Sequence, residues 1–356
     1  MSAEQFLGIF LVVLAGLWMG SGGWPIKLMK KYQYEHFGFV AMVIGLVLAP
    51  WIITLCFCPN ALSVYKSIWE NNRHAILVSN AWSLSWGIAN VLCFLCFVRI
   101  GFCLTGGILT GLGVSIGVMI PMIFKGSGHF QDAKDITSPA GLMVMAGVVV
   151  MVIGVIVVSF AGLGRDEVLK KKAAERSGSF VAGMIMAIIA GITSAGMSLA
   201  FVYSQGPIKE AMLAQGVPSI VSETFAVWAV GIIGGAAINI LFPAFLMTKH
   251  KSWSVLASSP RELLLSVIMG LNTIIAVVLM GKGMISIGAM GASIGFGIQQ
   301  ASQMIGNQSV GFIGGEWKDV HGMPRYQMYL AIGILIMAAV IMATGNYVAS
   351  LPAAGQ

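Results

Sequence analysis

Uncharged amide side chains recur at helical spacing in two stretches of an otherwise apolar sequence. The first stretch places four residues within an arc of about 80° on a helix: Asn80, Ser83, Gly87 and Asn90. Trp86 borders this arc. Because hydrocarbon offers polar groups no partner, such a face must bond a neighbouring helix or line a water-filled cavity. The sequence leaves both interpretations open, and only the second one provides a binding site.

The second stretch lies in the expected helix 286–313 and brings four amides within an arc of about 100°: Gln299, Gln300, Gln303 and Asn307. Amides donate and accept hydrogen bonds without charge, and an indole offers an apolar plate. Both faces are expected near mid-depth, where transporters bind substrate. Together they predict a site for a neutral, polyhydroxylated ligand, formed by Asn80, Trp86, Asn90, Gln299, Gln300, Gln303 and Asn307. The single amides Asn239 and Asn272 are expected to serve packing.

Few charged side chains fall within the apolar segments. Glu223 is the acidic residue that we place inside one, near the start of 220–247, where it would titrate during transport. A first-turn position at the interface, favoured by the helix dipole, is the alternative. Lys27 follows Pro25, which is expected to kink or stop the first helix. Lys27 then either lines the cytoplasmic mouth or extends to the interface.

The remaining titratable residues indicate anchoring rather than chemistry. Arg99, Lys282 and Glu316 fall at the ends of apolar segments, and all five histidines are expected in loops. The five cysteines lie in apolar segments of the first half, where a thiol packs as a small apolar group. We therefore expect no metal site, no cofactor and no disulfide framework. An enzyme is not expected either, because the apolar segments hold no cluster of nucleophiles, carboxylates or metal ligands.

The elements that must hold these residues are membrane helices. The chain has 356 residues, of which 58% are hydrophobic and 9% are charged, whereas soluble domains carry about 25% charged residues. Ten segments approach the roughly 20 apolar residues that a helix needs to cross a bilayer: 6–26, 38–58, 75–98, 101–124, 140–163, 179–203, 220–247, 262–281, 286–313 and 327–349. The sequence predicts an all-α membrane protein with ten transmembrane helices.

A basic loop, Arg165–Arg176, divides these helices into two sets of five. We expect a first repeat at 1–165, a cytoplasmic loop at 166–178 and a second, inverted repeat at 179–356, as is typical of transporters. Of the 20 Lys and Arg residues, 14 lie in loops after odd-numbered helices and 6 in loops after even-numbered ones. This bias predicts that both termini lie outside the cytoplasm. The net charge of +7 therefore reflects membrane topology, and nucleic acid is not an expected partner.

Several short tracts follow one another along these segments: Lys27, Lys30 and Lys31, then WGIAN (Trp86–Asn90), the tract ending Pro121-Met-Ile, GITSAGMSLA (Gly191–Ala200), GGAAIN (Gly234–Asn239) and GEWK (Gly315–Lys318). With them, nearly the whole chain resembles the L-rhamnose–proton symporter family of the drug/metabolite transporter superfamily. The resemblance implies an inverted five-plus-five arrangement, alternating access and proton-driven sugar uptake across a bacterial inner membrane. The family pattern has acidic and aromatic residues among the polar ones around 299–307, whereas this chain has no carboxylate there, and Glu223 has no clear counterpart in that pattern.

We therefore predict a secondary active transporter that imports a neutral sugar, L-rhamnose or a related sugar, by proton symport. Its expected partners are the sugar, H⁺ and the lipid bilayer. Trp86 would stack on an apolar face of the sugar, and Glu223 would be the coupling carboxylate. A metabolite or drug exporter of the same superfamily is the alternative, and it would have an aromatic, apolar cavity instead.

Overall fold

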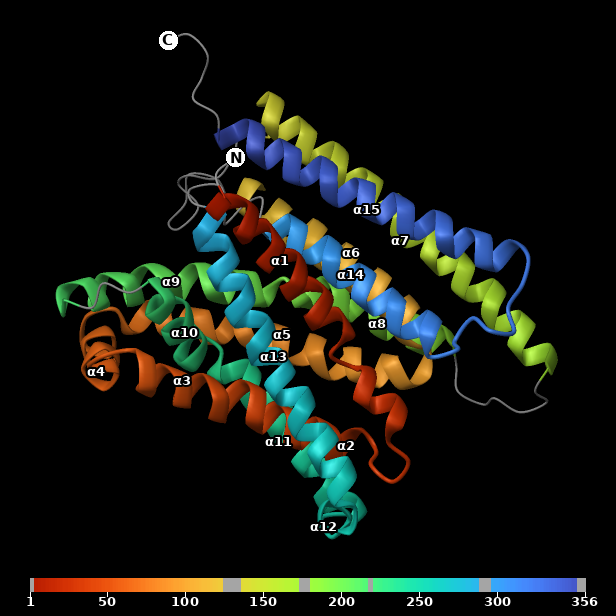
Figure 1. Cartoon of the computed structure of the whole chain (residues 1–356), viewed down its shortest axis with the longest axis horizontal. Helices are drawn as coiled ribbons and strands as arrows, with labels where there is room; N and C mark the ends of the chain where they lie inside the picture. Colours follow the sequence, from red (N-terminus) through yellow and green to blue (C-terminus); the bar gives the residue numbers. More distant parts are fainter. Residues whose placement is uncertain (1–2, 124–135, 173–179, 217–219, 288–295, 351–356) are drawn as a thin grey trace. The chain divides into compact units, whose positions relative to one another are not determined.

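The computed structural model describes residues 3–123, 136–172, 180–216, 220–287 and 296–350, and every regular element in these ranges is a helix (Figure 1). The elements are α1 (Ala3–Ser21), η1 (Trp24–Leu28), α2 (Tyr34–Met42), η2 (Val43–Leu48), α3 (Ala49–Phe57), α4 (Ala61–Asn71), α5 (Arg73–Arg99), α6 (Phe102–Ile123), α7 (Pro139–Lys172), α8 (Phe180–Ser194), α9 (Gly196–Ala214), α10 (Ile220–Gly231), α11 (Ile233–His250), α12 (Val255–Ser258), α13 (Pro260–Ile287), α14 (Phe296–Ile313) and α15 (Met323–Ser350).

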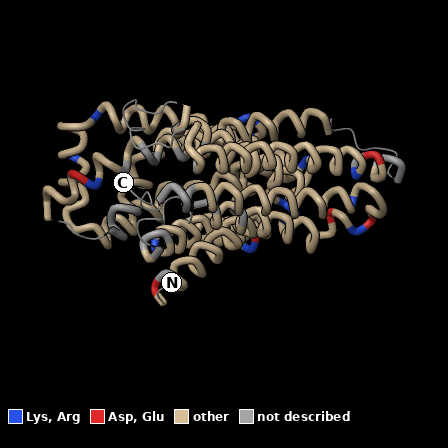
Figure 2. Tube along the Cα trace, turned by 90° about the horizontal axis from the view of Figure 1, so that it is seen from above, with Lys and Arg blue, Asp and Glu red and all other residues tan. Residues whose placement is uncertain are grey.

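Within the described ranges, six helical stretches are long and apolar enough to cross a membrane: Phe6–Leu28, Tyr34–Phe57, Arg73–Arg99, Gly141–Leu169, Pro260–Gly283 and Met323–Met342. Two shorter helical stretches, Phe102–Gly117 and Phe180–Ser194, are also apolar. Long stretches of helix carry no charged residue (Figure 2). These features confirm an all-α membrane protein.

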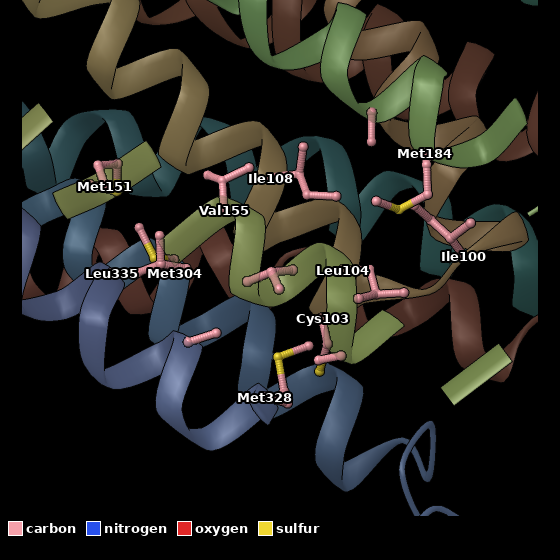
Figure 3. Packing of buried hydrophobic residues seen from close by; sticks show 14 of the residues in the cluster. Ile100, Cys103, Leu104, Ile108, Met151, Val155, Met184, Met304, Met328 and Leu335 are labelled. Carbon is pink, nitrogen blue, oxygen red and sulfur yellow. The ribbon is translucent and has the colours of Figure 1, made fainter. Parts of the chain in front are cut away.

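The chain forms two compact units, and each unit draws on both halves of the sequence. The first unit comprises 1–21, 95–192 and 282–356. In it, α7 and α15 lie side by side (Figure 1). Glycine makes this close approach possible, because a Cβ added to Gly154 would lie 2.6 Å from Cδ2 of Leu335. The core of this unit joins buried residues of α6, α7, α8, α14 and α15, including Leu104, Met151, Met184, Met304 and Met328 (Figure 3).

The second unit comprises 22–94 and 193–281. Here α2 packs against α11, and α10 packs against α3 and α9. The backbones of α5 and α11 approach closely, because a Cβ on Gly87 would lie 2.9 Å from the Cα of Gly235. A buried apolar cluster joins α4, α5, α9 and α10 and includes Val64, Ile68 and Met212.

Two helix boundaries test the expectations directly. The first helix stops at Ser21 and a short 3₁₀ helix containing Pro25 follows, which confirms the predicted stop. The predicted start of the helix at 286 is wrong, because α13 continues to Ile287 and α14 is described from Phe296.

The longest helix that was not expected is α4. Helix α4 fills the loop between the second and third predicted helices and is amphipathic. Its apolar side is buried through Val64 and Ile68, whereas Lys66 and Glu70 are exposed and lie 3.9 Å apart. Its 11 residues and polar face explain why a search for long apolar segments does not find it.

Candidate functional site

The amide of Asn80 joins α5 to its neighbours in the second unit. Its Nδ2 donates to the carbonyl oxygens of Ile76 and Val230, each at 2.9 Å. Its Oδ1 accepts the backbone N–H of Gly234 at 2.8 Å. The amide therefore makes three hydrogen bonds to protein, so the neighbouring-helix interpretation describes the geometry of Asn80.

Asn90 lies ten residues further along α5 and has a different environment. Its Nδ2 donates to Oδ1 of Asn239 at 2.9 Å and contacts Sδ of Met42 at 3.3 Å. Asn239 is buried and is itself held by the carbonyl oxygen of Gly235 at 2.8 Å. Asn90 is only half-buried, and its Oδ1 accepts no hydrogen bond from any described residue. The result is a positioned amide with an available acceptor.

Trp86 shares the α5 face with Asn90. Its ring lies against the backbone of α11, because a Cβ on Gly235 would be 2.7 Å from its Cε3. The indole is half-buried, and its N–H has no hydrogen-bond partner among the described residues. Trp86 and Asn90 together present an aromatic plate, an N–H donor and a carbonyl acceptor.

The amides of α14 lie in the first unit. Gln299 is buried, and its Nε2 donates to Oε1 of Gln303 at 3.0 Å and contacts Sδ of Met19 at 3.6 Å. Gln300 and Gln303 are half-buried. Asn307 is buried against α6: a Cβ added to Gly106 would lie 2.6 Å from the Cβ of Asn307. The described part of α14 begins at Phe296, so the mid-helix position expected for Gln299 stays a prediction.

Close packing between α1 and α14 holds this stripe in place. A Cβ on Gly20 would collide with the carbonyl oxygen of Gln303, and one on Gly16 would lie 2.6 Å from the Cβ of Ser302. The glutamine backbone is thus pressed against α1. The two amide stripes belong to different units, and their pairing in a single site stays a prediction.

The structure shows few contacts for the two charged candidates, Glu223 and Lys27. Glu223 lies in the first turns of α10, and its side chain is outside the described residues. Lys27 lies in η1 and is half-buried. The coupling and mouth roles of these residues stay predictions.

Sequence reasoning missed a carboxylate–imidazole pair that joins α2 to α11. Nδ1 of His250 lies 3.0 Å from Oε1 of Glu35, and the Glu35 side chain is buried. The expectation that all five histidines lie in loops is wrong: His36 is in α2, His74 is in α5 and His250 ends α11. His129 lies outside the described residues. The error arose because polar residues fill the terminal turns of these helices, outside the apolar segments.

His36 has a structural role in the same region. Its Nδ1 accepts the backbone N–H of Gln33 at 3.0 Å, as part of a capping box at the start of α2. Its Nε2 lies 3.3 Å from the carbonyl oxygen of Ser252. Since Nδ1 accepts this hydrogen bond, Nε2 carries the ring hydrogen and donates a hydrogen bond to the Ser252 oxygen.

Glu316 is not the simple topology anchor that its position suggested. Its carboxylate accepts the backbone N–H groups of Phe102 at 2.8 Å and Cys103 at 3.3 Å, at the start of α6. Nη1 of Arg165 lies 3.9 Å from it and donates to the carbonyl oxygen of Ile100 at 2.9 Å. Glu316 therefore caps a helix more than 200 residues away in sequence.

Comparison with known proteins identifies the family. The family model described as L-rhamnose-proton symport protein (RhaT) matches residues 1–349. The chain belongs to this L-rhamnose–proton symporter family. A protein of Escherichia coli (strain K12 / DH10B) named "L-rhamnose-proton symporter" is 28% identical over 353 residues, covering 97% of this chain and 99% of the relative. One of the same name from Klebsiella pneumoniae (strain 342) is 27% identical over 328 residues, covering 90% and 92%. No solved structure matches the chain.

Membership of the symporter family confirms the resemblance drawn from the short sequence tracts. It makes the chain a multi-pass transporter of the inner membrane and not an enzyme. Two of those tracts now have a structural meaning. WGIAN carries Trp86 and Asn90, and GGAAIN carries Gly235 and Asn239, which hold them in place.

Proposed function

We propose that this symporter-family protein imports L-rhamnose or a closely related neutral sugar together with protons, by alternating access. The family match along nearly the whole chain and the names of the relatives support this substrate and this coupling ion. The described amide-rich faces suit such a ligand, because they offer donors and acceptors without charge.

The proposed architecture has ten transmembrane helices in an inverted five-plus-five arrangement, with both termini outside the cytoplasm. Helices occupy the described parts of all ten apolar segments, which supports this count. The excess of Lys and Arg after odd-numbered helices supports the orientation. Attachment of a membrane-impermeant label to cysteines introduced near either terminus would test it, since labelling only in inverted vesicles would contradict the orientation.

We propose that Trp86 and Asn90 contact the sugar, while a contact with Gln300 and Gln303, which belong to the other unit, stays a prediction. The observation that carries this assignment is the Asn90 amide, fixed by Asn239 through its nitrogen and left with an available carbonyl oxygen. Asn80, Gln299 and Asn307, the other predicted site residues, would support the site, because they are engaged with or buried against neighbouring protein.

Uptake of labelled L-rhamnose into proteoliposomes with an imposed pH gradient tests the function. Asn90→Ala is expected to raise KM about 3- to 10-fold, since a hydrogen bond contributes about 0.5–1.5 kcal/mol. The matched control is Asn71→Ala on exposed α4, which should leave KM unchanged. If Asn90→Ala and Gln303→Ala both left KM intact, the site would be wrong. Uptake that ignored the pH gradient would instead remove the symport claim.

We propose Glu223 as the coupling carboxylate, because carboxylates within apolar helices commonly carry protons in transporters. Glu223→Gln is expected to abolish accumulation driven by a pH gradient while preserving exchange of internal for external sugar. Glu210→Gln, at an exposed position on α9, is the control. Normal gradient-driven accumulation by Glu223→Gln would assign coupling elsewhere. Lys27 would line the cytoplasmic mouth, as its place after the first helix suggests.

A further inference from the structure

A groove of about 380 Å³ lies between α4, α5, α10 and α11 in the second unit. Its walls are mainly large apolar side chains: Ile68 and Trp69 of α4, Ile76 and Leu77 of α5, and Val230 and Ile233 of the other two helices. Trp69, Leu77 and Ile233 are each at least half exposed, so the groove opens on the outside of the unit. None of these residues belongs to the proposed sugar site.

The polar groups at this groove are already bonded to protein. The hydroxyl of Tyr65 donates to the carbonyl oxygen of Ala226 at 3.0 Å. The amide of Asn80 makes the three hydrogen bonds described above. A sugar would find few partners here, whereas an acyl chain needs none. In a membrane protein, an open apolar groove of this kind is suited to lipid hydrocarbon.

Positive charge collects at one end of the groove. Arg73 is the first residue of α5 and is exposed, and the first turn of this helix contains no acidic residue. Residues 73, 76, 77 and 80 share one helix face, so Arg73 lies one turn beyond the groove lining. Cations at this end add to the positive end of the helix dipole, which is unfavourable unless an anion lies nearby.

Helix α4 contributes another cation beside Trp69. Lys66 is exposed and precedes Trp69 by three residues, which places the two side chains on neighbouring positions of the helix surface. Glu70, 3.9 Å away, is also exposed, so this pair is weak and leaves Lys66 able to contact another anion. Tryptophan is itself common where a helix meets the lipid headgroups.

We propose that this groove binds an anionic phospholipid, with one acyl chain between Trp69 and Leu77 and the phosphate at Arg73 and Lys66. Charge complementarity favours an anionic over a zwitterionic headgroup. Apart from Asn80, which lines the groove and supports the proposed sugar site, the groove has no residue of the proposed sugar and proton sites, so this proposal does not depend on which substrate is carried.

Quenching of tryptophan fluorescence by brominated lipids tests the proposal on the full-length protein in detergent. Subtracting the signal of Trp69→Phe from that of the wild type isolates Trp69. Brominated phosphatidylglycerol is expected to quench Trp69 at lower concentrations than brominated phosphatidylcholine. Arg73→Gln and Lys66→Gln should each weaken the preference about fivefold, which is about 1 kcal/mol per cation. Lys318→Gln, at an exposed position between α14 and α15, should keep the preference.

Three outcomes would overturn the proposal. Equal quenching of Trp69 by the two lipids would show ordinary boundary lipid only. An unchanged preference in both Arg73→Gln and Lys66→Gln would show that these cations do not hold the headgroup. Ile233→Phe, which narrows the groove without changing charge, should reduce Trp69 quenching by phosphatidylglycerol, and full quenching in this variant would place the acyl chain elsewhere.

Discussion

Removing the carboxylate of Glu262 should destabilise the second unit strongly. Glu262 is only 6% exposed and lies in the first turn of α13. Its Oε1 accepts the backbone N–H groups of Lys30 at 3.0 Å and Lys31 at 3.1 Å. Its Oε2 accepts that of Tyr32 at 2.6 Å and a second contact from Lys31 at 3.0 Å. One side chain therefore holds the loop that precedes α2.

The magnitude follows from these bonds. A hydrogen bond to a charged group contributes about 1.5–3 kcal/mol net, and three donors lose their acceptor in Glu262→Ala. Lys30 and Lys31 are exposed, so water replaces part of what they lose, whereas the backbone of Tyr32 is buried. We expect a loss of about 3–5 kcal/mol. Glu262→Gln keeps one acceptor oxygen and should lose roughly half of that.

Thermal unfolding of the purified protein in detergent, followed by tryptophan fluorescence, measures this effect. At roughly 2 °C per kcal/mol for a chain of this size, Glu262→Ala should lower Tm by roughly 6–10 °C, with Glu262→Gln in between. Glu210→Ala, an exposed carboxylate on α9, controls for the loss of charge. A Tm for Glu262→Ala within 1 °C of the wild type would refute the reasoning, because it would mean that water satisfies all three donors equally well.

Three further results are expected. Gly16→Val should lower stability by about 1–3 kcal/mol in the same assay, since its side chain would enter the backbone of α14, and normal stability would contradict that packing. In the purified protein, N-ethylmaleimide at pH 7.5 should modify exposed Cys56 faster than buried Cys58, because the surrounding side chains limit access to the Cys58 thiol. Peptide mass spectrometry measures both rates, and equal rates would argue against burial. Glu35→Gln should lower Tm in the same assay, because it weakens the contact between the buried Glu35 carboxylate and Nδ1 of His250. An unchanged Tm would show that this contact contributes nothing to stability.

Asn80 and Asn90 show which features of the candidate site the sequence predicts and which it does not. Helical spacing correctly placed Asn80 and Asn90 on one face of one helix, because that periodicity is a local property. It could not tell that Asn80 is fully bonded while Asn90 keeps an available oxygen. That difference depends on the backbone of α10 and α11, which lies 150 residues away in sequence.

The buried carboxylates show the same limit. Glu262 and Glu316 stand at the edges of apolar segments, where a sequence reader expects exposed anchors. Only the fold brings them to the unpaired N–H groups of distant chain segments. The sequence around such a residue does not reveal its role, because its partners are backbone N–H groups, which nearly all residue types share.

By itself, the sequence determined that this is an all-α membrane transporter of the L-rhamnose–proton symporter family, and where its first helix stops. The length of the apolar segments indicates the membrane helices, the ring of Pro25 ends the first helix, and short sequence tracts indicate the family. All three are local features of the sequence. The tertiary structure alone decided which polar groups are satisfied, which glycines bring helices together and where α4 leaves an open groove. Such features arise from contacts between segments far apart in the chain, and packing rather than spacing sets them.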